Sequence, residues 1–358
     1  MITGADGKIR ASTVSNLSAR ELLLAARLDR LSRAYPRAIS QSDPIRFPAA
    51  YDRPDDREVA GWIASAFAYG RVETILASVG RVLAALGPHP ARAVDSISDF
   101  PRFAREDLAG FRHRFHSAAD ASALLYAIAS VRAEAGSVRK FFEGRQRPED
   151  ADAGAMLSRA VVRVLDLDWR PAVGRRSLSA TSPVRFFFPD PASGSACKRW
   201  NLYLRWMVRR DALDFGLWKD ISPARLVIPT DTHVHRVARR LNLTRRKSAD
   251  WKTAREITDR LTRFDPTDPV RYDYALCRLG VLGVCRPALA ASRCGECPLA
   301  EGCPAGRRRL GAVSHCEPSP GCHPEPSPSR YPEPSPACHP EERSDEGSLS
   351  YLAESPFA

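Results

Sequence analysis

Four cysteines lie close together near the end of the main body of the sequence. They are Cys285, Cys294, Cys297 and Cys303, within nineteen positions, whereas residues 1–196 contain no cysteine. In a cytosolic chain, which is what we expect here, such a group favours a metal site over disulfides. Four thiolates with a central C-x2-C pair can bind one tetrahedral zinc ion or the irons of a 4Fe–4S cluster. The spacing alone leaves both metals open.

A lysine stands on the first turn of a predicted helix, after the segment Gly194-Ser-Ala-Cys-Lys-Arg-Trp-Asn201. The positive end of a helix dipole disfavours a cation there by about 0.3–1 kcal/mol. That repulsion, together with the neighbouring Arg199, favours the neutral amine, the form in which Lys198 can act as a nucleophile. The alternative is a lysine whose stem covers aromatic surface or whose ammonium contacts a phosphate.

An aspartate occupies a helix start in the segment Pro229-Thr-Asp-Thr-His-Val-His-Arg236. Asp231 can serve only as an N-cap. A carboxylate in this position also stays ionised and can stabilise a developing cation. The two histidines of the segment lie two positions apart and cannot share one helix face, so no paired metal site is expected from them.

The elements that position these residues are predicted to be helices, because apolar residues recur at helical spacing and no series of alternating strands is found. The helix that carries Lys198 has one apolar stripe, formed by Trp200, Tyr203, Leu204, Met207 and Val208. The other expected helices cover residues 56–69, 72–86, 118–135, 138–142, 152–167, 232–241, 248–263 and 271–283. Residues 170–194 are expected to form a loop. The fold class is therefore predicted to be all-α.

The sequence divides into three parts. Residues 1–20 are expected to be a flexible N-terminus, residues 21–310 a folded body that includes the cysteine loop 285–303, and residues 311–358 a disordered tail. Glu-Pro-Ser-Pro occurs three times in that tail with an eight-residue period, and so much proline cannot bury a core. The tail's three cysteines and three histidines could bind a metal, but its low complexity favours a repeat-derived extension without a role.

The charge of the body points to a polyanionic partner. The chain has a formal net charge of +12, and residues 314–358 contain eight acidic and two basic residues, which leaves +18 on residues 1–313. Such a charge favours nucleic acid, although it can also serve solubility. No apolar run reaches the ~18 residues of a membrane helix, and the start lacks the apolar stretch of a signal peptide. A cytoplasmic protein without a membrane partner is expected.

The three motifs, in this order, resemble the helix-hairpin-helix DNA glycosylase superfamily, whose iron–sulfur members include endonuclease III. Over about residues 25–305 the chain is most similar to an uncharacterised bacterial family distantly related to those enzymes. This resemblance implies a two-lobed helical helix-hairpin-helix glycosylase-like fold with a C-terminal four-cysteine metal loop. It also implies that the four cysteines are the ligands of a 4Fe–4S cluster, with zinc as the alternative.

The resemblance assigns roles to particular residues. Lys198 matches the lysine that attacks the sugar C1′ and forms a Schiff base, and Asp231 matches the aspartate required for glycosidic cleavage. Gly194, Ser195 and Ala196 would form the hairpin whose backbone amides hold a DNA phosphate. Two further groups of residues are expected to contact DNA: Tyr69 and Arg71 at the gap left by an extruded base, and the basic residues Arg199, Arg286 and Arg293.

The implied function is a base-excision repair DNA glycosylase, with AP lyase activity through the lysine, acting as a monomer on a damaged base in duplex DNA of the nucleoid. One alternative is a non-catalytic DNA-binding protein of the same fold. Another is an RNA-binding or RNA-processing protein with a zinc loop. The lesion and the opposite base do not follow from the sequence.

Overall fold

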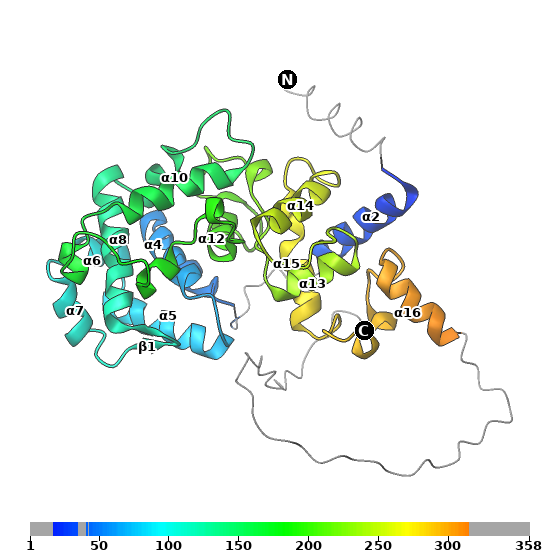
Figure 1. Cartoon of the computed structure of the whole chain (residues 1–358), viewed down its shortest axis with the longest axis horizontal. Coiled ribbons are helices and arrows are strands. Elements are labelled where there is room, and N and C mark those ends of the chain that lie inside the picture. Colours follow the sequence, from blue (N-terminus) through cyan, green and yellow to red (C-terminus); the bar gives the residue numbers. More distant parts are fainter. Residues whose placement is uncertain (1–16, 35–40, 42, 315–358) are drawn as a thin grey trace, which may run out of the picture.

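A computed structural model describes residues 17–34, 41 and 43–314, and these residues are predominantly helical (Figure 1). Within these ranges the strands form a single hairpin, in which β1 (Arg112–His113) pairs antiparallel with β2 (His116–Ser117). The predicted helical class is therefore confirmed. Most of the N-terminal segment 1–20 and of the repeat tail 311–358 lies outside the described residues. No helix of the described ranges has both the length and the apolar character needed to cross a membrane.

One group of helices is formed by the first half of the chain (Figure 1). Its members are α3 (Arg46–Ala49), α4 (Pro54–Ala66), α5 (Val72–Leu86), α6 (Pro90–Asp95), α7 (Phe100–Glu106), α8 (Ala118–Ala135), α9 (Val138–Glu143), α10 (Ala153–Leu165) and α11 (Arg170–Val173). The bounds predicted for α5 and α8 are confirmed. Helix α8 begins at a capping box of Ser117 and Asp120 and ends at Gly136 in the left-handed conformation, the start and stop signals typical of a helix.

A second group contains the two ends of the described chain. It consists of α2 (Ala19–Ala34), α13 (Thr232–Arg240), α14 (Trp251–Thr262), α15 (Asp273–Val281) and α16 (Pro304–Ser314). Helix α2, blue in Figure 1, lies among the yellow and orange helices from the end of the chain. Arg27 Nη1 donates to the Pro298 carbonyl at 3.0 Å, and Tyr272 Oη donates to Asp29 Oδ1 at 2.9 Å. This contact of α2 with the C-terminal helices was not predicted from the sequence.

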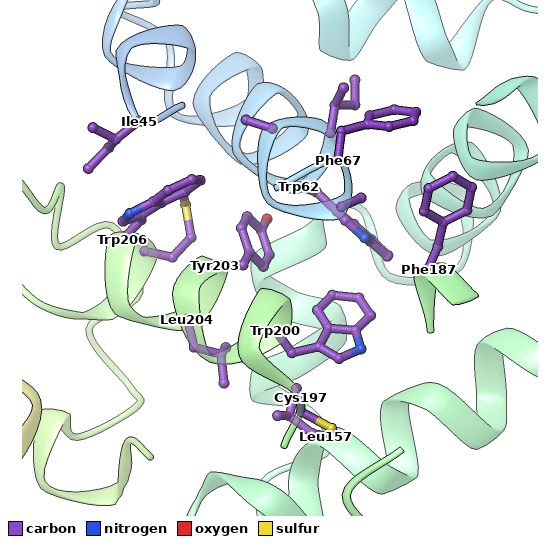
Figure 2. Close-up of a cluster of buried hydrophobic side chains, with 14 of the residues drawn as sticks. Ile45, Trp62, Phe67, Leu157, Phe187, Cys197, Trp200, Tyr203, Leu204 and Trp206 are labelled. Atoms are coloured by element: carbon purple, nitrogen blue, oxygen red, sulfur yellow. The ribbon is translucent and has the colours of Figure 1, made fainter. Parts of the chain in front are cut away.

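Helix α12 (Lys198–Val208) lies between the two groups (Figure 1). Its predicted apolar stripe is buried, which confirms that expectation. Figure 2 shows Trp62 of α4, and Phe67 directly after that helix, across the core from Trp200, Tyr203 and Trp206 of α12. The two helices approach closely at Gly61, where an added Cβ would lie 2.7 Å from Met207 Cε. Helix α12 is buried on almost all sides, including its arginines.

Several predicted boundaries differ from the observed ones. The helix expected at 248–263 begins at Trp251, because Asp250 rather than Ser248 caps it through the Thr253 amide. The helix expected at 271–283 begins with a 3-10 turn, Pro269–Tyr272, before α15. The expected loop 170–194 contains α11 and two 3-10 turns, Pro183–Phe187 and Pro191–Ser193. Three further 3-10 turns lie at Pro223–Arg225, Leu289–Ala291 and Cys294–Glu296.

Candidate active site

Lys198 and Asp231 lie side by side in the structure. Lys198 Nζ is 3.9 Å from Asp231 Oδ2, and the two side chains are 37% and 18% exposed. Lys198 is the first residue of α12, and Asp231 is the N-cap of α13. The starts of α12 and α13 therefore meet at one site, and the two side chains there are only partly exposed to solvent.

Asp231 uses both carboxylate oxygens. Oδ1 accepts a hydrogen bond from the Val234 amide at 2.8 Å, so the capping role is present. Oδ2 faces the lysine and also accepts a weak bond from the Cys277 thiol at 3.8 Å. Burial, with smaller contributions from nearby carboxylates, raises the pKa of Cys277 well above its usual value, so this thiol is a neutral donor.

Lys198 has a second partner at the end of α4. Its Nζ donates to the Ala68 carbonyl at 3.4 Å. Carbonyls just beyond a helix C-terminus lie at the negative end of its dipole, and this offsets the repulsion from the N-terminus of α12. Sequence reasoning missed this contact because a backbone carbonyl carries no residue signature.

Arg199 points inward and does not present a free guanidinium to DNA. Its Nη1 donates to the Ala66 carbonyl at 3.1 Å and its Nη2 donates to the Phe186 carbonyl. The guanidinium carbon lies 3.9 Å from the ring centroid of Phe186. Burial lowers the pKa of Arg199 to about 10. The expected direct DNA contact is therefore corrected: Arg199 holds the start of α12 against α4 and the Phe186 segment.

Helix α15 fixes the relative position of α12 and α13. Arg205 of α12 forms buried ion pairs with Asp273, at the start of α15, and with Asp214 at 3.3 Å. Farther along α15, an added Cβ at Gly280 would lie 2.6 Å from His233 Cβ, so α13 and α15 pack closely there. The same α15 supplies Cys277 to the carboxylate of Asp231. The lysine–aspartate pair thus depends on three helices.

The segment 194–196 before α12 is docked against α14. The Trp251 amide donates to the Gly194 carbonyl at 2.9 Å, and Ser195 pairs with Asp250 in an isolated bridge. Gly194 has a φ of 86° and is exposed. Its own amide donates to the Pro191 carbonyl at 2.9 Å. The expectation that the Gly194 amide holds a phosphate is therefore corrected, and Ser195 and Ala196 are left as the hairpin's candidates.

Tyr69 and Arg71 flank the turn between α4 and α5. Tyr69 is partly buried, and its hydroxyl donates to His116 Nδ1. Its ring centroid is 4.8 Å from that of Phe186. Arg71 is exposed at the N-cap of α5. Both residues lie close in the chain to Ala68, the partner of Lys198.

The four cysteines of the loop 285–303 gather beside α13 and α16. Arg240 Nη1 donates to Cys285 Sγ at 3.0 Å, and the Gly306 amide donates to Cys303 Sγ at 3.3 Å. Burial, followed by the proximity of the other three thiols, raises the pKa of Cys297 to about 12. The four thiols are therefore near enough to affect one another's ionisation.

These thiols do not surround a single point. Among the described residues, no group of three or more His, Cys, Asp or Glu side chains is arranged to hold one metal ion. Arg286 and Arg293 are exposed on the same loop. Arg286 Nε donates to the Gly283 carbonyl at 3.3 Å, and Arg293 Nη1 pairs with Glu296 at 3.0 Å.

The fold and site define a helical protein in which a lysine–aspartate pair joins two helix starts and a four-cysteine loop follows. The chain belongs to the family described as "Protein of unknown function (DUF2400)", which matches residues 43–282. The matched range includes Lys198 and Asp231 and ends before Cys285. Searches of the curated proteins and of the solved structures found no match.

Proposed function

We propose that this protein is a DNA glycosylase with AP lyase activity that removes a damaged base from duplex DNA. The observation that carries the proposal is the 3.9 Å separation between Lys198 Nζ and Asp231 Oδ2 at the meeting of two helix starts. An amine and a carboxylate placed together in a partly enclosed site are the groups needed to capture and to stabilise an electron-poor sugar carbon.

The reaction follows from these two side chains. The damaged base leaves the stack, at a cost of a few kcal/mol that is smallest for mispaired or lesioned bases. As the glycosidic bond breaks, the base departs with the bonding electrons and takes up a proton, while Asp231 stabilises the positive charge on the sugar. The ammonium of Lys198 first gives one proton to solvent. Its nitrogen then bonds to C1′ and loses a second proton to solvent.

Strand cleavage follows from the resulting adduct. The C1′–O4′ bond opens, O4′ gains a proton, and the C1′–nitrogen bond becomes an imine. The imine acidifies the C2′ proton; its removal expels the 3′ oxygen with the electrons of the C3′–O bond. The Ala68 carbonyl orients Lys198 for attack, and Cys277 orients the Asp231 carboxylate.

We also propose that the chain has the fold of the helix-hairpin-helix glycosylase superfamily. Two groups of helices meet at α12 (Figure 1), and Lys198 follows the hairpin at Gly194. In this assignment Ser195 and Ala196 face a DNA phosphate, and the positive body, with Arg286 and Arg293, neutralises further phosphates. The protein would act on DNA of the nucleoid.

The cofactor in this proposal is a 4Fe–4S cluster held by Cys285, Cys294, Cys297 and Cys303. Four thiols gathered in one loop beside α13 and α16 support a metal centre. The choice of a cluster over zinc rests on the resemblance to the iron–sulfur glycosylases. When bound, the cluster would fix the loop that carries Arg286 and Arg293.

Borohydride trapping tests the proposal. The full-length protein is incubated with duplexes that carry an abasic site, an oxidised base or a deaminated base, and the imine is reduced to a stable adduct. We expect an adduct with the wild type and with Lys140→Ala, an exposed lysine on α9. Lys198→Ala and Lys198→Arg should give none, because an arginine keeps the charge but forms no such imine.

The other outcomes separate the alternatives. Adducts that persist in both Lys198 variants would contradict the lysine mechanism. DNA binding without any adduct would favour a non-catalytic DNA-binding protein. Preference for structured RNA, together with zinc in the purified protein, would favour an RNA-processing protein.

A further inference from the structure

Three aromatic side chains form a partly exposed cluster next to the lysine–aspartate pair. Phe115 is 49% and Phe186 40% exposed, which is unusual for phenylalanine. Their ring centroids are 5.0 Å apart, and Tyr69 lies 6.0 Å from Phe115 and 4.8 Å from Phe186. We call Tyr69, Phe115 and Phe186 the aromatic patch.

The aromatic patch stands on a rigid support. Phe115 lies in the turn between β1 and β2, after Arg114, whose φ is 53°. His116 Nε2 donates to the Pro183 carbonyl at 2.9 Å, and the opposite ring nitrogen accepts from Tyr69. Burial lowers the pKa of His116, which favours the neutral imidazole that can make both bonds in these directions. The hairpin is thereby tied to the segment that carries Phe186.

The patch is continuous with the candidate active site. Tyr69 directly follows Ala68, whose carbonyl accepts from Lys198. The guanidinium of Arg199, the next residue of α12, lies 3.9 Å from the ring centroid of Phe186 and 5.3 Å from that of Tyr69. One element, the start of α12, therefore supports both the amine and the aromatic surface.

The surroundings of the patch are positively charged. Arg112 and Arg114 of the hairpin are exposed, as is Arg71 across the turn. The side chain of Arg114 lies over Gly70, with its Cδ 3.1 Å from the position of an added Cβ. Exposed rings bordered by arginines fit a ligand that offers flat π faces and phosphates together.

We infer that the aromatic patch is a stacking surface for an unpaired nucleobase of the DNA strand held at Lys198 and Asp231. This inference rests on the proposed function. It adds the feature of the DNA that the protein recognises, which is a base that is neither paired nor stacked on a neighbour. A paired base cannot offer its face to Phe115, whereas a base next to a lesion, bulge or abasic site can. The arginine border selects a nucleic acid over an apolar peptide.

The test compares two fluorescent DNAs of the same sequence, a fully paired duplex and a duplex with one unpaired 2-aminopurine. Affinity is measured by anisotropy, and stacking by quenching of the 2-aminopurine emission. Wild-type protein should bind the bulged DNA more tightly than the paired DNA and quench its emission. Phe115→Ala and Phe186→Ala should each weaken binding to the bulged DNA about tenfold and relieve the quenching.

Matched variants separate stacking from other effects. Phe115→Tyr keeps a ring and should behave as the wild type. Val162→Ala removes a 60% exposed apolar side chain from α10, away from the patch, and should change neither readout. Thermal melting of each variant confirms folding. Affinity for the paired duplex should stay within about twofold, because phosphate contacts dominate there.

Three results would overturn the inference. If the wild type binds DNA but the alanine variants keep its bulge preference and quenching, the stacking surface is wrong while the proposed function stands. If the wild type binds neither DNA, both proposals fail. If the wild type is a dimer that Phe115→Ala converts to a monomer without changing DNA binding, the patch is an interface between two copies of this chain.

Discussion

Asp231 uses its two carboxylate oxygens for different tasks, a helix cap on one side and a lysine contact on the other. The two tasks can be separated by substitution, because asparagine caps a helix about as well as aspartate but carries no charge. Asp231 can therefore contribute both to stability and to the proposed chemistry.

Asp231→Asn should keep the free energy of unfolding within a few tenths of a kcal/mol of the wild type, whereas Asp231→Ala should lower it by about 0.5–2 kcal/mol. Both variants should slow base release by about 10²–10³-fold, because both remove the charge that stabilises the sugar cation. Thermal unfolding and single-turnover base release measure the two effects. Full activity in Asp231→Asn would show that the residue is only a cap.

The sequence was sufficient to select Lys198, Asp231 and the cysteines as candidates, since lysine at a helix start and clustered thiols are visible as residue types. It could not predict that the Ala68 carbonyl contacts Lys198 or that Cys277 contacts Asp231. The first is a backbone atom, and the second is an isolated cysteine whose meaning depends on α15 packing against α13. Arg199 was expected to face DNA, but its guanidinium turns inward to the Ala66 and Phe186 carbonyls, which are backbone atoms that the sequence does not reveal.

At the scale of elements, the sequence predicted helices best where a strong cap and a long apolar stripe coincide, as in α8. It missed α6 and α7, because short helices give weak patterns, and it gave the wrong start for α14, where two possible caps compete. It also missed the longer helix α2. The position of α12 between the two groups of helices was also not predicted, since its burial depends on partners distant in sequence.

A buried carboxylate joins α4 and α9 to the segment that follows α12. Glu58 of α4 accepts from the Trp218 indole at 3.1 Å and from the Arg139 amide, in the first turn of α9, at 3.1 Å. Burial raises the pKa of Glu58 from 4.5 to about 7 despite these two donors. The folded state therefore holds this proton more tightly than the unfolded chain does.

The raised pKa makes stability depend on pH. The contribution of Glu58 is fully present below about pH 4.5 and is lost as the pH rises through about 7. The free energy of unfolding of the wild type, relative to Glu58→Gln, should fall by about 3 kcal/mol between about pH 5 and about pH 8. Denaturant titrations measure this difference, with the exposed Glu149→Gln as control. A difference that does not change with pH would contradict the shift.

At the scale of the whole molecule, a positive body and a four-cysteine loop stand beside a lysine–aspartate site. The cysteines lie beyond the range 43–282 matched by the family. If the loop holds a 4Fe–4S cluster, part of the folding free energy comes from the metal.

Protein purified without oxygen should contain about four irons and about four sulfides per chain. Cys297→Ser should lower the iron content, the melting temperature and the affinity for DNA, because the loop that carries Arg286 and Arg293 loses its anchor. Elemental analysis and melting curves test this, with the buried Cys197→Ser as control, since that thiol bonds the Pro189 carbonyl instead. One zinc per chain in place of iron would contradict the cluster.

In the proposed reaction, Lys198 forms the covalent bond to the sugar. The most direct measurement is mass spectrometry of the proteolysed, borohydride-reduced complex of the full-length protein with a duplex that contains an abasic site. We predict a DNA-derived mass on the peptide that contains Lys198 and on that lysine. Attachment to another amine with Lys198 unmodified, or a complete absence of the adduct from protein that binds the duplex, would contradict the account.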